Sequence, residues 1–153
     1  MDSFISNPKS ETKTISIILP TENEFSIKLK NALGRNYKII KSRDKYNLID
    51  FMILNKVNIK HIYLEYKRRN GNNRKYSSVI INECKIRAIK QNYNRCLFVF
   101  EYDNSLDFIK YDNEVFSSLN GSFVKNQDVR QIPNHLLIES FDKLIEFLKS
   151  ELK

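Results

Sequence analysis

The sequence predicts an α/β fold in which a mixed β-sheet is flanked by helices. Strand-length apolar segments alternate with three segments whose apolar residues recur at helical spacing. The 153 residues are 41% hydrophobic and 29% charged, which is typical of one globular domain with a core of its own. We therefore expect a polar, flexible arm over residues 1–13 and a single domain over residues 14–153.

The first elements follow from local signals. TISIILP alternates apolar residues and stops at Pro20, which predicts a short strand. TENE then predicts a helix start, because Thr21 can act as the N-cap and Glu24 completes a capping box. The helix is expected to end at Gly34. A strand at NYKIIKS, a turn at RDKY and a strand at NLIDFMIL follow. The last is apolar on both faces except at Asp50, as in the middle of a sheet.

In the second half of the chain we expect a helix from Ser77 or Ser78 to Tyr93, with Ile81 and Cys84 on its apolar side. RCLFVFEY is apolar on both faces and predicts a central strand. The remaining expected elements are short strands at FIKYD, EVFSS and SFVKN, a hairpin turn at Asn120–Gly121, a strand-like segment at NHLLIE, and an amphipathic helix at SFDKLIEFLKSELK.

The composition favours a polyanionic partner. A formal charge of +8 indicates binding to a partner with phosphate groups, which Lys and Arg neutralise. A solvated basic surface, or a codon bias that enriches Lys, Asn and Ile, would give the same charge. No apolar run approaches the length of a membrane span, and the first residues lack the apolar centre of a signal peptide. We expect an intracellular protein of the cytoplasm or nucleus, not secreted and without a membrane partner.

The two cysteines and two histidines argue against a zinc site. Cys84 and Cys96 fall in an expected helix and an expected buried strand, so both are interpreted as reduced packing residues. His61 and His135 are far apart in sequence, and the chain has no CxxC pair. Any metal is therefore expected to bind oxygen ligands.

Charged residues interrupt the segment IYLEYKRRNGN. In a strand, Glu65 and Lys67 share a face with Tyr63. One explanation of the two charges is an ordinary salt bridge on the exposed face of an edge strand. Asp50, however, precedes Glu65 by fifteen positions, enough for a turn between two neighbouring antiparallel strands. Two carboxylates on adjacent strands favour a cation, and an oxygen-only pair suits Mg²⁺. Lys67 is then placed to orient or deprotonate an attacking water, which is the chemistry of phosphodiester hydrolysis.

The strings IDFMI and IYLEYK, in this order of elements, resemble the PD-(D/E)XK nuclease superfamily over roughly residues 14–102. The resemblance implies a restriction-endonuclease-like αβββαβ core and a metal-dependent endonuclease, similar to Holliday-junction resolvases and other structure-selective or homing endonucleases. It implies that Asp50 and Glu65 bind Mg²⁺, with Mn²⁺ as a substitute, and that Lys67 assists the nucleophile. Glu24 matches an additional ligand of many members, but the capping box explains it equally well. Ile49 departs from the motif's proline, and Asp44 is a rival to Asp50.

The loop after the predicted catalytic strand supplies candidate phosphate contacts, namely Arg68, Arg69, Arg74 and Lys75, with ordinary solvated charge as the alternative. We expect DNA as the substrate and a homodimer that supplies two sites. A nucleic-acid-binding domain without catalysis and an RNA-directed nuclease remain alternatives. The sequence shows no groove-reading helix and no exposed aromatic pair for single-stranded stacking.

Overall fold

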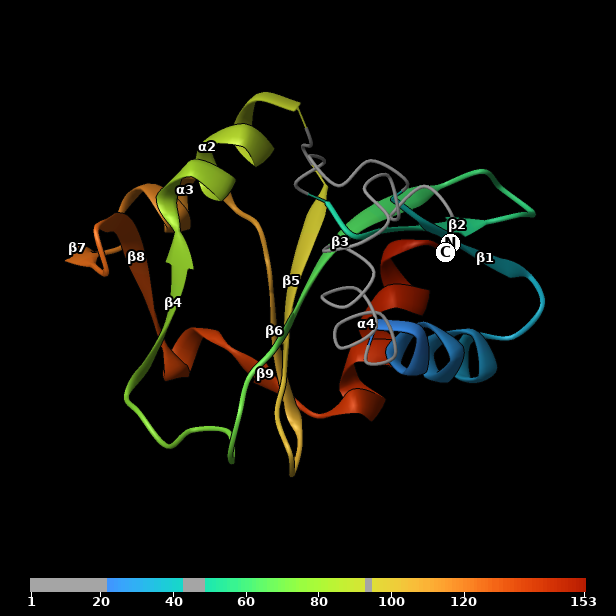
Figure 1. The fold of residues 1–153 in the computed structure, drawn as a ribbon. Coiled ribbons are helices and arrows are strands. Elements are labelled where there is room, and N and C mark those ends of the chain that lie inside the picture. The colour runs from blue at the N-terminus through green and yellow to red at the C-terminus, as the bar shows by residue number, and fades with distance from the viewer. Residues whose placement is uncertain (1–21, 43–48, 93–94) are drawn as a thin grey trace, which may run out of the picture. The chain divides into compact units, whose positions relative to one another are not determined.

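The computed structural model describes residues 22–42, 49–92 and 95–153. Contacts divide the chain into two compact units, Met1–Tyr66 with Ile145–Lys153 and Lys67–Leu144, and each is described by itself (Figure 1). The expected arm, the strand at TISIILP and the turn at RDKY with Asp44 lie outside the described residues. The single domain over residues 14–153 stays a prediction.

The first unit begins with a helix over residues 22–33, as the sequence predicts. Its buried face carries Phe25, Leu29 and Leu33, which follow one another at intervals of four residues. The helix ends at Gly34, whose φ of +90° lies in the left-handed region and whose N–H donates to the carbonyl of Lys30 at 3.0 Å. This confirms the expected glycine C-cap.

Three antiparallel strands follow in the order β1-β2-β3: β1 Tyr37–Lys41, β2 Phe51–Asn55 and β3 His61–Arg68. All three were expected. The helix over residues 22–33 packs on one face of these strands, where the Phe25 ring stacks on Tyr66 at 4.4 Å and lies 6.1 Å from Phe51. The last residues of the chain are bonded to this unit, since the carbonyl of Leu152 accepts hydrogen bonds from the side chains of Asn55 and Asn58.

The second unit differs from the sequence prediction at its first elements. Residues 78–82 form strand β4 Ser78–Asn82, and helix α2 Glu83–Asn92 starts only after it, so the expected helix start at Ser77 or Ser78 is wrong. Val79 and Ile81 are buried and Ile80 between them is exposed, which is the period of a strand. Pairing with strand β8 Gln127–Pro133 then fixes β4 as part of a sheet, with Val79 opposite Ile132.

The two cysteines are both free thiols. Cys96 is buried, as expected, and begins strand β5 Cys96–Glu101. Cys84 is exposed, so its interpretation as a packing residue is wrong. The cause is the later start of α2, which changes the face on which Cys84 lies.

Strand β5 pairs antiparallel with β6 Leu106–Lys110, and β6 pairs with β9 Ile138–Glu139. Cys96 to Phe100 and Leu106 to Ile109 are buried, which confirms the expectation that RCLFVFEY is a central strand. A second sheet has the order β4-β8-β7, with β7 Gly121–Val124.

Two further predictions in this unit are wrong. EVFSS is not a strand but falls in helix α3 Asn113–Ser117, which Asp112 caps by accepting a hydrogen bond from the N–H of Val115 at 3.0 Å. The turn of the β7–β8 hairpin is at Lys125 and Asn126, whose φ values are 48° and 63°, and not at Asn120–Gly121.

The remaining elements are η2 Asn134–Leu136, which with β9 replaces the strand-like segment at NHLLIE, and the expected amphipathic helix α4 Phe141–Glu151. The α/β class is confirmed. The expected order of a helix, three strands, a helix and a strand is also found, with β4 added before α2. In the described part of the chain, none of the helices is long and apolar enough to cross a membrane.

Candidate active site

Asp50 lies immediately before β2 and beside β3. The last pair of the β2–β3 register is Phe51 with Leu64. If this register is extended by one residue, Asp50 lies opposite Glu65. The Oδ2 atom of Asp50 accepts a hydrogen bond from the backbone N–H of Tyr66 at 2.8 Å. The Asp50 carboxylate is therefore held against the backbone of β3 at the residue that follows Glu65.

Glu65 is a charged residue inside a strand and is only 1% exposed. Its neighbours Leu64 and Tyr66 point to the face covered by Phe25, so Glu65 points to the other face of the sheet. Residues directly opposite each other in an antiparallel pair have Cβ atoms about 5 Å apart on one face. The extended register therefore places Asp50 and Glu65 on one face of neighbouring strands, and the meeting of their carboxylates stays a prediction.

Lys67 follows Glu65 at the next same-face position of β3 and is half-buried. A strand rises about 3.3 Å per residue, so the two Cα atoms are roughly 6–7 Å apart along β3. The long Lys67 side chain can therefore serve the same surface as the Glu65 carboxylate. The assignment of Lys67 to catalysis stays a prediction.

The donor set suits a hard divalent cation. Two carboxylates on neighbouring strands repel each other, and Glu65 is buried where an ionised group is costly without a positive charge nearby. Mg²⁺ binds in proteins through one or two carboxylates plus waters and substrate phosphate, so this pair fits its chemistry. Among the described residues, no group of three or more His, Cys, Asp or Glu side chains could hold a metal.

Glu24 is exposed on the helix over residues 22–33. Its proposed capping partner, Thr21, lies outside the described residues. An exposed carboxylate is solvated by water and does not need a cation for stability. Its role as a further metal ligand stays a prediction.

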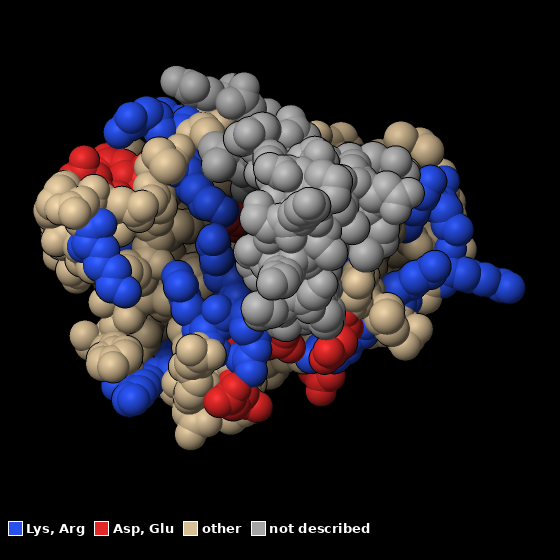
Figure 2. Space-filling view, viewed as in Figure 1, with Lys and Arg blue, Asp and Glu red and all other residues tan. Residues whose placement is uncertain are grey.

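The four basic residues at the end of β3 and in the loop after it are in different environments. Arg68 donates to the carbonyls of Arg69 at 2.7 Å and Glu101 at 3.0 Å and pairs with the exposed Asp103. Arg69 donates to the carbonyl of Ile80 at 3.1 Å, and its guanidinium lies 5.7 Å from the centre of the Phe100 ring. Figure 2 shows Lys and Arg side chains gathered on the face of the second unit where β4 lies.

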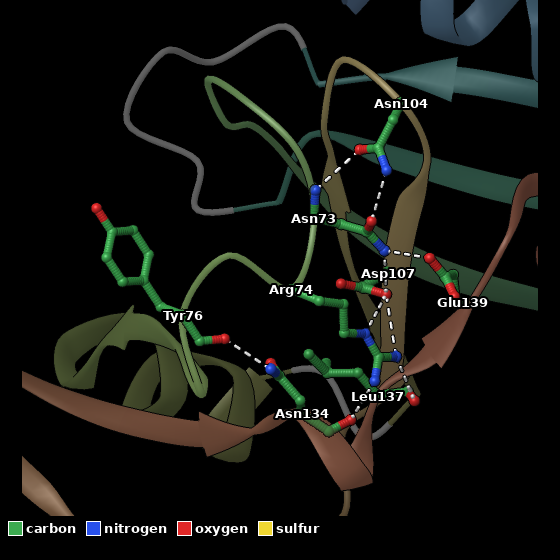
Figure 3. Close-up of polar contacts among 8 residues, drawn as sticks. All are labelled: Asn73, Arg74, Tyr76, Asn104, Asp107, Asn134, Leu137 and Glu139. Atoms are coloured by element: carbon green, nitrogen blue, oxygen red, sulfur yellow. Dashed lines mark hydrogen bonds and ion pairs between the residues drawn. The ribbon is translucent and has the colours of Figure 1, made fainter.

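Arg74 is the member of this group with the largest structural role. Its Nη2 lies 3.2 Å from Oδ1 of the buried Asp107, and its guanidinium also donates to the carbonyls of Asn134 and Leu137 (Figure 3). A phosphate contact by Arg74 would compete with these bonds. Lys75 has no such anchoring contact among the described residues, and its Nζ lies 5.7 Å from the Tyr76 ring centre.

Sequence reasoning missed Tyr76, which is 71% exposed and directly follows the basic loop. Within the described ranges, Phe123 on β7 is the other strongly exposed ring, at 67%. The sequence contains a signal for Tyr76, because an aromatic residue within a basic loop is typical of single-strand binding surfaces. Its exposure, however, depends on how the loop folds.

The comparisons with known proteins show the fold. The chain is similar to the structure of D212, a nuclease from a fusselovirus, with a TM-score of 0.50 and 13% sequence identity over 95% of each chain. No family model matches the chain, and no curated protein matches it. The similarity confirms a fold that a viral nuclease also has, and leaves membership of the PD-(D/E)XK superfamily a prediction.

Proposed function

We propose that this protein is a metal-dependent endonuclease that hydrolyses phosphodiester bonds in DNA. The observation that carries the proposal is the position of Asp50. Its Oδ2 accepts the Tyr66 N–H at 2.8 Å, and it lies one residue beyond the Phe51–Leu64 pair, as the buried Glu65 does on β3. The formal charge of +8 and the similarity in fold to a viral nuclease support the same activity.

The residues of the chain have separable roles in this proposal. Asp50 and Glu65 would hold Mg²⁺, with Mn²⁺ as a substitute, and the N–H of Tyr66 fixes the orientation of the Asp50 carboxylate. When bound, Mg²⁺ stabilises negative charge on the scissile phosphate. Lys67 would orient the attacking water or, as the neutral amine, take a proton from it. As the ammonium, it would place positive charge near the negative charge that develops on the phosphate.

Substrate binding is assigned to the basic loop. Arg68, Arg69 and Lys75 are the proposed contacts to phosphate. Arg74 is left out because its ion-pair partner Asp107 is buried, whereas Asp103, the partner of Arg68, is exposed. Contacts of this kind carry no sequence information. We also propose a twofold dimer, since cutting both strands of a duplex requires two active sites.

The test is a panel of linear, nicked, flapped, four-way and single-stranded DNA substrates, with the RNA counterparts, incubated with and without Mg²⁺. The proposal expects DNA cleavage that depends on the metal and is lost in Lys67→Ala. Cleavage confined to RNA would replace DNA by RNA as the substrate. A folded wild-type protein that binds DNA but cuts no substrate with Mg²⁺ or Mn²⁺ would leave a binding domain without catalysis.

A further inference from the structure

The loop between β3 and β4 is anchored to the second unit by a buried ion pair. Arg74 has a φ of 64°, a left-handed conformation that is uncommon for an arginine. Its Nε and Nη2 lie 3.3 and 3.2 Å from Oδ1 of Asp107, which is 1% exposed. Further bonds to the carbonyls of Asn134 and Leu137, both 3.1 Å, fix the guanidinium from the opposite side (Figure 3).

The residue before Arg74 is held equally firmly. The Asn73 N–H donates to Oδ1 of Asn104, and the Asn104 amide donates back to the Asn73 side chain, both at 2.8 Å. The Asn73 amide nitrogen also donates to Glu139 and to Asp107. The loop therefore holds one conformation through contacts with β6, β9 and the β5–β6 turn.

This anchored loop presents Tyr76 to solvent. The Tyr76 carbonyl accepts a hydrogen bond from the Asn134 side chain at 2.6 Å, which fixes the backbone, while the ring is 71% exposed. Figure 3 shows the ring directed away from the polar cluster. The Lys75 ammonium lies 5.7 Å from the ring centre. An exposed aromatic ring beside a cation is an arrangement by which proteins stack the bases of single strands.

A cavity begins at the next residue. Its volume is about 550 Å³, and the polar residues that line it are Ser77, Ser78, Ser118, Asn120, Gln131 and His135. The other lining residues are apolar, and no Asp, Glu, Lys or Arg is among the described residues that line it. Hydroxyl and amide groups between apolar walls match a nucleobase, which has apolar faces and a polar edge. They do not match a phosphate or a metal ion.

We propose that the cavity beginning at Ser77 binds an unpaired nucleobase, with the Tyr76 ring stacked on the neighbouring base and Lys75 facing the phosphate between them. This inference rests on the proposed function for its nucleic-acid substrate and adds the class of substrate: DNA with unpaired nucleotides. A fully paired duplex supplies this contact only if a base is flipped out of the stack, which costs unstacking and unpairing energy.

The test measures binding without cleavage. Fluorescence anisotropy in EDTA compares two labelled DNA duplexes with a single-stranded tail, one with bases in the tail and one with abasic residues, so that both have the same phosphates. Wild type is expected to bind the base-bearing tail about tenfold more tightly, given the usual strength of base–aromatic stacking. Tyr76→Ala should remove this discrimination, and Tyr76→Phe should retain it.

Two further variants separate the cavity from the surface in general. Ser118→Phe places a ring in the cavity and should reduce the discrimination, although Ser118 is distant in sequence from the basic loop. Phe123→Ala removes the second strongly exposed ring among the described residues, on β7, and should leave the discrimination between the two tails unchanged. Equal discrimination by wild type and Ser118→Phe would show that the base does not enter the cavity.

The inference and the proposed function fail in different ways. If wild type binds both tails equally, or if Tyr76→Ala discriminates as well as wild type, the inference is overturned. Mg²⁺-dependent cleavage that needs Lys67 would still establish the endonuclease. Conversely, discrimination through Tyr76 by a protein that cuts nothing would support base binding and reject the endonuclease.

Discussion

Nη2 of Arg74 lies 3.2 Å from Oδ1 of Asp107, yet the pKa of Asp107 is raised, as in a buried acid, and not lowered, as in an ordinary ion pair. Burial raises the pKa of Asp107 above its ordinary value of 3.8, and this outweighs the lowering by Arg74; the nearby Glu139 raises it further. The folded state therefore binds the Asp107 proton more tightly than the unfolded state does.

This relationship predicts an unusual pH dependence. Below the pKa that Asp107 has in the unfolded chain, the carboxyl is protonated in both states and its contribution to stability is complete. This contribution is lost as pH rises through the higher pKa of Asp107 in the folded state. The unfolding free energy of wild type minus that of Asp107→Asn should therefore fall as pH rises above about 4. Urea denaturation at a series of pH values measures it. A difference that grows with pH would mean that the Arg74 pairing outweighs burial.

Asp103→Asn is the matched control for this measurement. The hydrogen bond from Arg68 lowers the pKa of Asp103, so its contribution is present above the unfolded pKa and lost as pH falls through the folded one. The difference between wild type and Asp103→Asn should change with pH in the opposite direction. Its size should be small, because the group is exposed.

Substitutions at the candidate active site should separate chemistry from binding. Lys67→Ala should abolish Mg²⁺-dependent cleavage with DNA affinity nearly unchanged, because Lys67 acts on the water and on charge formed in the transition state. The reduction expected for loss of one such group is on the order of 10²–10⁴-fold in rate. Single-turnover cleavage and anisotropy measure the two properties. Cleavage by Lys67→Ala at the wild-type rate contradicts the assignment.

The carboxylates should behave differently from Lys67. Asp50→Asn and Glu65→Gln each remove a negative ligand, so cleavage should be lost. DNA affinity in EDTA should be unchanged or higher, because a charge that repels phosphate has been removed. The two properties can be measured on the same protein samples. Retained Mg²⁺-dependent cleavage in both variants would show that the metal binds elsewhere.

Binding through the basic loop should depend on salt. Arg68→Ala with Arg69→Ala should weaken DNA binding for every sequence tested and flatten the plot of log affinity against log salt by roughly 0.9 per lost phosphate contact. Lys143→Ala with Lys149→Ala, which removes two exposed lysines of α4, is a charge-matched control that should have less effect. An unchanged slope in the arginine variant would show that DNA approaches another surface.

The end of the first helix gives a prediction about stability. Gly34 has a φ of +90°, and Gly34→Ala should lower the unfolding free energy by about 1–2 kcal/mol, since a side chain is strained in that conformation. Gly121→Ala is the control, because its φ is not positive and an added Cβ would meet Val129 O at an ordinary 3.7 Å. Thermal or urea unfolding measures both, and equal effects would contradict the role of Gly34.

The sequence by itself determined the features that depend on neighbouring residues. The helix end at Gly34, the strands at Phe51–Asn55 and His61–Arg68, the buried strand at Cys96–Glu101 and the terminal helix all follow from local periodicity and capping. The same-face spacing of Glu65 and Lys67 was also readable, because side chains alternate along any strand. Asp50 could be matched to Glu65 because only a short connection joins their strands.

Tertiary structure decided the features that depend on distant partners. Residues 78–82 form a strand because β8, about fifty residues later, pairs with them, and no local pattern contains that partner. The helix at EVFSS is an exception, because its N-cap Asp112 is a local signal that the sequence prediction did not use. The sequence predicts that Arg74 is a surface charge, but in the structure it pairs with the buried Asp107 and fixes the loop to β6. Tyr76, two residues later in the same loop, is exposed. Local sequence sets which conformations are favourable, whereas burial and pairing across the chain select among them.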